Sequence, residues 1–164
     1  MEKLQVYFDF ACPYCWRAHG LLERILPEYP HIVPEWHPCE AHPRPERYGK
    51  HSDLCARVFL WAQATGAIPD GLAEKLFTLC LRSRTDTESP AELAKALAAF
   101  FPDVAVRNLL VGSAYAQEVA DNNTAVWDTI EADAVPTYVW GGRILIAAEN
   151  VGVTEGMLRA FFSR

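Results

Sequence analysis

Residues 4–25 read LQVYFDFACPYCWRAHGLLERI. Apolar residues alternate with others from Leu4 to Phe10, which is the pattern of a strand with one buried face. From Cys15 to Ile25 the apolar residues recur at helical spacing, and Pro13 suits the first position of that helix because its missing N–H group is not needed there. The sequence therefore predicts a strand that leads directly into a helix, with two cysteines at the junction.

The rest of the chain predicts the remaining elements. Residues 31–36 (HIVPEW) predict a second strand, parallel to the first across a βαβ crossover. Residues 51–131 are almost entirely helical in pattern and include a capping box at Ser89. Residues 135–140 and 143–146 predict a hairpin with a two-glycine turn, and Thr154 can cap a last helix. The expected order is βαβ, a helical block, then a hairpin and a helix.

The predicted chemistry lies in Cys12 and Cys15. Their spacing puts both thiols on one helix face, close enough for the two sulfurs to bond. Cys12 precedes the first helical turn, where unpaired N–H groups and the helix dipole favour a thiolate. Cys15 lies one turn further in, on the apolar face. We expect Cys12 to attack or be attacked, and Cys15 to resolve the mixed disulfide.

Two other interpretations of this motif stay open. The cysteines can be a coincidental buried pair, or half of a zinc site completed by the segment His37–His42. The strand before the motif and the helix after it favour a redox centre without metal. Cys55 and Cys80 fall on amphipathic helices and are expected to be inert core residues. Cys39 is expected in the core as well, with a third thiol near the pair as the alternative.

The segment Phe8–Trp16, together with Val135-Pro136-Thr137, resembles the DsbA-like thioredoxin-fold thiol:disulfide oxidoreductases, with the cytoplasmic FrnE-like proteins as the nearest branch. The resemblance implies an α/β thioredoxin fold (βαβ…ββα) interrupted by an all-helical insertion. On that pattern residues 1–50 and 132–164 form the thioredoxin-like domain, and residues 51–131 form the helical insertion.

The resemblance also implies roles around the two thiols. Pro136 would be a cis proline packed beside the sulfurs, and Pro13 and Tyr14 would support the site from between the cysteines. The backbone of Val135 would pair with an extended substrate segment, as in β-strand addition. We expect Trp16, directly after the motif, to contact the substrate too.

Asp9 lies three residues before Cys12, on the strand face opposite Phe8 and Phe10. A buried carboxylate behind the thiols could relay a proton when Cys15 must become a thiolate. The alternative is a strand-end aspartate that caps the chain or meets solvent, and the sequence does not decide between the two.

The composition limits the other classes of function. The 164 residues are 51% hydrophobic and 22% charged, with a formal net charge of −6 at pH 7. These values exclude a mostly disordered chain and argue against a nucleic-acid-binding protein. No apolar run approaches the roughly 20 residues of a membrane span, and the N-terminal residues lack the features of a secretory signal. We expect a cytoplasmic protein without nucleic-acid or membrane partners, as a monomer or a homodimer.

The sequence thus predicts a thiol:disulfide oxidoreductase that acts on protein or peptide thiols without a flavin, nucleotide or metal cofactor. A second hypothesis is a glutathione-dependent enzyme with glutathione as co-substrate, since the same fold hosts kappa glutathione transferases and hydroxychromene-carboxylate isomerases. A third is a metal-binding or chaperone-like module that retains the motif. The presence of both Cys12 and Cys15 favours the first hypothesis.

Overall fold

The computed structural model describes residues 1–47 and 49–163, so Tyr48 and Arg164 of the predicted thioredoxin-like part lie outside it. Its N-terminal part is a βαβ unit: β1 (Glu2–Phe8), α1 (Pro13–Ile25) with a 3-10 turn (Leu26–Glu28), and β2 (Ile32–Pro38). The two strands pair in parallel, as predicted. β1 ends two residues earlier than expected, and Phe10 is nevertheless fully buried.

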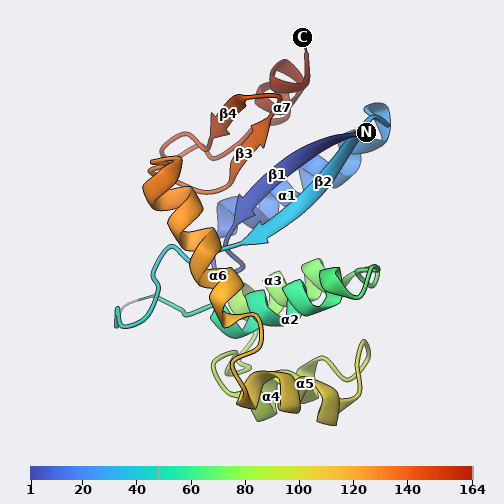
Figure 1. Cartoon of the computed structure of the whole chain (residues 1–164), viewed down its shortest axis with the longest axis vertical. Helices are drawn as coiled ribbons and strands as arrows, with labels where there is room; N and C mark the ends of the chain where they lie inside the picture. Colours follow the sequence, from blue (N-terminus) through green and yellow to red (C-terminus); the bar gives the residue numbers. More distant parts are fainter. Residues whose placement is uncertain (48, 164) are drawn as a thin grey trace.

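The C-terminal part adds a hairpin and a helix to this unit. β3 (Thr137–Trp140) and β4 (Arg143–Ile146) pair in antiparallel fashion, and β3 also pairs with β1, which gives the strand order β2-β1-β3-β4. Gly141 and Gly142 both have positive φ, as a tight two-residue hairpin turn requires. Thr154 caps α7 (Glu155–Phe162), which contacts α1 beside the sheet (Figure 1). The predicted hairpin and final helix are confirmed.

The region between these parts is helical, as expected. It contains α2 (Asp53–Ala64), α3 (Leu72–Arg82), α4 (Pro90–Ala96), α5 (Asp103–Val111) and α6 (Ala116–Asn123), which continues into a π-helical turn (Thr124–Thr129). The sequence did not resolve α5 as a separate helix. α6 begins directly after Tyr115, which adopts a left-handed conformation with φ 64°. Figure 1 shows α4 and α5 at the end of the molecule opposite the two termini.

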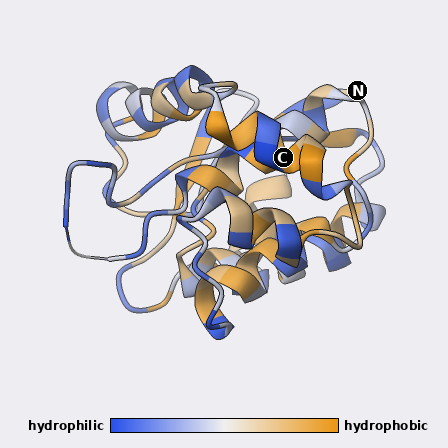
Figure 2. Ribbon diagram, turned by 90° about the horizontal axis from the view of Figure 1, so that it is seen from below, coloured by the Kyte–Doolittle hydropathy of each residue, from blue (hydrophilic) through white to orange (hydrophobic). Residues whose placement is uncertain are grey.

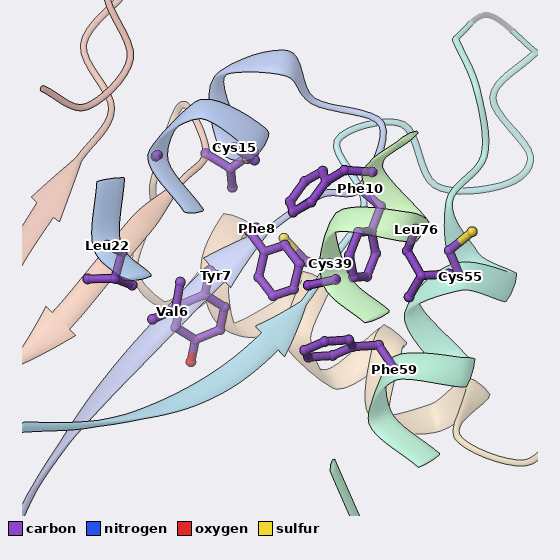
Figure 3. Close-up of a cluster of buried hydrophobic side chains, with 14 of the residues drawn as sticks. Val6, Tyr7, Phe8, Phe10, Cys15, Leu22, Cys39, Cys55, Phe59 and Leu76 are labelled. Carbon is purple, nitrogen blue, oxygen red and sulfur yellow. The ribbon is translucent and has the colours of Figure 1, made fainter. Parts of the chain in front are cut away.

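The insertion and the sheet share one hydrophobic core (Figure 3). Phe10 packs against Phe59 of α2 and Phe77 of α3, with ring centroids 5.4 and 4.9 Å apart. Gln63 of α2 also donates to the Trp36 carbonyl oxygen at 3.0 Å and accepts its N–H at 3.1 Å, so one amide side chain pairs with the edge strand β2. These contacts hold α2 and α3 against the end of the sheet where the cysteine motif begins.

The helices carry both hydrophobic and hydrophilic residues along their length (Figure 2). Within residues 1–47 and 49–163, none of them combines the length and apolar character that crossing a bilayer requires.

Candidate active site

Cys12 is the N-cap residue of α1. Its sulfur accepts the backbone N–H of Cys15 at 3.3 Å, and Pro13 occupies the first turn, as predicted. The side chain is partly exposed. Because the unpaired N–H groups of a helix N-terminus favour negative charge, this position suits a thiolate.

Cys15 lies one turn further along α1 and is buried, with only 1% of its surface exposed. Its sulfur lies 3.5 Å from the backbone nitrogen of Asp9, which donates to it. The interaction with the Cys15 thiol, aided by the backbone N–H of Cys15, lowers the pKa of Cys12. Burial, together with the hydrogen bond to Cys12, raises the pKa of Cys15 well above its ordinary value. The two thiols therefore differ as an attacking and a resolving cysteine must.

Asp9 is buried beside this pair and does not meet solvent. Its Oδ1 atom accepts the Ser52 hydroxyl at 2.5 Å and the Ala11 N–H at 2.8 Å, and its Oδ2 atom accepts the Ala41 N–H at 2.9 Å. The hydrogen bond to Ala11 is local, because Asp9 caps the backbone two residues further along the chain. Asp9 therefore caps the end of the strand and is buried as well. Burial nevertheless dominates and raises the pKa of the carboxyl group. The solvent-exposed alternative is therefore wrong, and a carboxylate fixed by three donors lies behind the thiols.

Val135 and Pro136 reach the motif from far along the chain. The Cys12 thiol lies 3.8 Å from the carbonyl oxygen of Val135, to which it donates. The Val135–Pro136 peptide bond is cis. The Pro136 carbonyl oxygen accepts the N–H of Ala147 at 3.0 Å, which ties this segment to the chain after β4.

The loop after β4 packs on Tyr14, which lies between the two cysteines, and this contact was not expected from the sequence. Gly152 has φ +76°, and a Cβ atom there would lie 2.8 Å from the ring of Tyr14. Arg17 places its guanidinium group 5.3 Å from the Tyr14 ring centroid and also donates to the Val151 carbonyl oxygen. Asn150 and Gly152, both common in turns, are the signal from which this tight loop could have been suspected.

Trp16 lines a groove of about 500 Å³ beside the motif, together with Pro13 and Arg17 of α1 and Glu74 and Arg82 of α3. The indole N–H of Trp16 donates to Glu74 at 2.7 Å, and Arg82 lies 4.9 Å from its ring centroid. Glu74 and Arg82 could not be identified from the sequence, because both come from a helix more than fifty residues away.

Cys39 is fully buried at the end of β2, where its N–H donates to the Phe8 carbonyl oxygen at 2.8 Å. Figure 3 shows it next to Phe8 within the core, which agrees with the core interpretation. Burial raises its pKa well above the ordinary value, with the charge of Asp9 as the next cause. Across residues 1–47 and 49–163, no three His, Cys, Asp or Glu side chains are grouped so that they could hold a metal ion.

Several solved structures that superpose on this chain are described as DsbA proteins. A probable DsbA oxidoreductase from Streptomyces coelicolor superposes with a TM-score of 0.75 at 16% identity, covering 100% of this chain and 92% of that one. The oxidoreductase DsbA of Xylella fastidiosa gives 0.69 at 17% identity, covering 99% and 85%. Reduced DsbA1 from Neisseria meningitidis gives 0.66 at 14% identity, covering 98% and 82%. At these identities the likeness shows the shared fold.

The family is assigned from the sequence and not from these superpositions. No curated protein matches it, but residues 3–159 match the family model described as a DSBA-like thioredoxin domain. The predicted thioredoxin fold is confirmed, and the chain belongs to the DSBA-like thioredoxin family.

Proposed function

We propose that the chain is a thiol:disulfide oxidoreductase that exchanges disulfides with protein or peptide thiols through Cys12 and Cys15. The observation that carries this proposal is the contrast between the two sulfurs. Cys12 is partly exposed at a helix N-terminus with a lowered pKa, and Cys15 is buried with a raised one. A thiolate that substrate can reach, backed by a protonated second thiol, is the arrangement that disulfide exchange needs.

In the reducing direction, the Cys12 thiolate attacks a substrate disulfide. One substrate sulfur leaves as a thiolate and takes up a proton, and the other stays bonded to Cys12. Cys15 then loses its proton and attacks the Cys12 sulfur, which forms the Cys12–Cys15 disulfide and releases the second substrate thiol. Two electrons pass from the protein to the substrate, and the reverse sequence oxidises a dithiol. No flavin, nucleotide or metal takes part.

Asp9 is suited to assist the step in which Cys15 loses its proton. Its backbone N–H contacts the Cys15 sulfur, and its carboxylate is held in the same buried region by Ser52. Its negative charge opposes ionisation of both thiols, although the hydrogen bond with Cys15 outweighs it at Cys12, whose pKa is lowered. A carboxyl group with a raised pKa is a better proton acceptor than an ordinary aspartate, so we assign Asp9 a positioning and proton-transfer role.

The substrate would lie across Cys12 between two surfaces. The Val135 backbone, whose carbonyl oxygen is already beside the Cys12 sulfur, supports pairing with an extended peptide. On the other side, the groove lined by Trp16 offers an aromatic surface with both charge signs at its rim. We place the reaction in the cytoplasm, where glutathione is an additional thiol partner.

A redox titration tests the proposal. The protein is equilibrated with glutathione redox buffers, its free thiols are trapped with a mass-shifting reagent, and the modified cysteines are located by peptide mass spectrometry. We expect a Cys12–Cys15 disulfide whose potential lies between about −120 mV, as in DsbA, and about −270 mV, as in thioredoxin. A protein that carries glutathione on Cys12 and never forms this disulfide would contradict the proposal and favour a glutathione-dependent enzyme.

The charge of Asp9 gives a prediction on pH dependence. In the reduced protein, the rate of Cys12 alkylation should rise with pH through a midpoint below the ordinary thiol value of about 8.5. Asp9→Asn removes a negative charge that opposes the thiolate, so the midpoint should fall further. Glu92→Gln, which removes an exposed carboxylate on α4, serves as the control and should leave it unchanged. A midpoint that is unchanged or rises in Asp9→Asn would show that the Asp9 charge does not oppose the Cys12 thiolate.

A further inference from the structure

Two cysteines outside the active-site motif form a second close pair of thiols. The sulfur of Cys80 on α3 lies 3.6 Å from the sulfur of Cys55 on α2, although the residues are 25 positions apart in the sequence. Both side chains are buried, with 1% and 0% of their surface exposed. From the sequence each was expected to be an inert core residue, because helical spacing within one element does not show which residue of another helix lies opposite.

We propose that Cys55 and Cys80 form a second disulfide, which joins α2 to α3 within the helical insertion. The S–S distance in a disulfide is about 2.05 Å, so the two sulfurs need to approach by only about 1.5 Å. The two sulfurs already face one another in a hydrogen-bonding arrangement. Figure 3 shows Cys55 next to Leu76 of α3, at the contact between the two helices.

The bond would connect the two helices that contact the active-site segment. Ser52, directly before α2, donates to Asp9, and Glu74 of α3 accepts the indole N–H of Trp16. Both helices also pack on Phe10, through Phe59 and Phe77. A disulfide between α2 and α3 therefore fixes, relative to one another, the parts of the insertion that support the site.

The reaction needs an oxidant, and a small-molecule disulfide such as glutathione disulfide balances it under oxidising conditions; in a reduced cytoplasmic glutathione pool the pair stays as two thiols. One thiolate of the pair attacks glutathione disulfide and releases one glutathione. The other thiol then loses its proton, attacks this mixed disulfide and releases the second glutathione. The protein loses two electrons and two protons in all. Because the hydrogen bond with Cys80, together with burial, raises the pKa of Cys55 well above its ordinary value, we expect the bond to form during folding, before the two thiols are enclosed.

Refolding tests the proposal independently of the proposed enzymatic function. A variant with Cys12→Ser and Cys15→Ser is unfolded and reduced, refolded with glutathione disulfide, alkylated and digested for mass spectrometry. We expect the peptides of Cys55 and Cys80 to be recovered as one disulfide-linked species, and Cys39 to be recovered alkylated. Recovery of Cys55 and Cys80 as alkylated or separately glutathionylated peptides would overturn the proposal. Neither result depends on whether Cys12 and Cys15 are catalytic.

Thermal unfolding of the same variant supplies a second readout. The oxidised form should melt roughly 5–10 °C above the reduced form, since the bond closes a loop of 25 residues in the unfolded chain. Adding Cys39→Ala should preserve this difference between redox states, whereas adding Cys80→Ala should abolish it. Each comparison is made within one variant, so that a cavity left by alanine does not affect it. Equal melting temperatures before and after oxidation would overturn the proposal.

Discussion

Replacing Cys12 with serine is expected to abolish disulfide exchange, with turnover lower by roughly 10³-fold or more. Serine is a preferred N-cap residue, so its hydroxyl can still accept the Cys15 N–H and α1 should remain intact. What the variant lacks is a sulfur that ionises near neutral pH. The measurement is the reduction of insulin by dithiothreitol with the protein as catalyst, and circular dichroism checks that the fold is retained.

Cys15→Ser should fail in a different way. Cys12 remains to attack the substrate, but no second thiol releases the product, so a mixed disulfide between Cys12 and the substrate should accumulate and appear as a mass increase. Cys39→Ala serves as the control and should keep wild-type turnover. Wild-type turnover in both active-site variants would rule out the proposed mechanism.

The elements of the thioredoxin-like part could be predicted from the sequence because their signals are local. Alternation from Leu4 to Phe10 indicated β1, and two adjacent glycines indicated the hairpin turn after Trp140. Ser89 and Thr154 each accept a backbone N–H three residues later, as their positions before a helical pattern indicated. The start of α6 could not be read in this way, because it follows Tyr115, whose left-handed conformation is unusual for a residue other than glycine and is not indicated by the local sequence.

The site was predictable only where its residues are neighbours in sequence. The spacing of Cys12 and Cys15 at a strand–helix junction was enough to predict a partly exposed cysteine at the start of α1 and a buried one a turn later. The burial of Asp9 could not be settled, because it depends on Ser52 and Ala41, which arrive from the loop before α2. The pairing of Cys55 with Cys80 depends in the same way on how two helices pack. Patterns of neighbouring residues predict individual helices and strands. Contacts between helices and strands depend on how they pack in three dimensions, which cannot be read from a single sequence.

Arg57 on α2 shows how much a contact between two helices can contribute to the free energy of unfolding. Its guanidinium group is buried and donates to the carbonyl oxygens of Leu109 at 2.9 Å, Gly112 at 2.6 Å and Ala114 at 2.8 Å. The first two oxygens belong to the C-terminal end of α5, where the helix dipole is negative. Burial lowers the pKa of Arg57, which shows that enclosing the charge has a cost. The three charge-assisted hydrogen bonds offset that cost.

Arg57→Met is therefore expected to lower the free energy of unfolding by about 2–4 kcal/mol, measured by urea denaturation. Methionine fills much of the same space, but it leaves three carbonyl oxygens without their donor. Arg57→Lys keeps the charge but not the planar fork, so we expect an intermediate loss. Arg107→Met removes an exposed arginine of α5 and should change stability by no more than about 0.5 kcal/mol. If Arg57→Met proved as stable as Arg107→Met, α5 would have to be held to α2 by its apolar contacts alone.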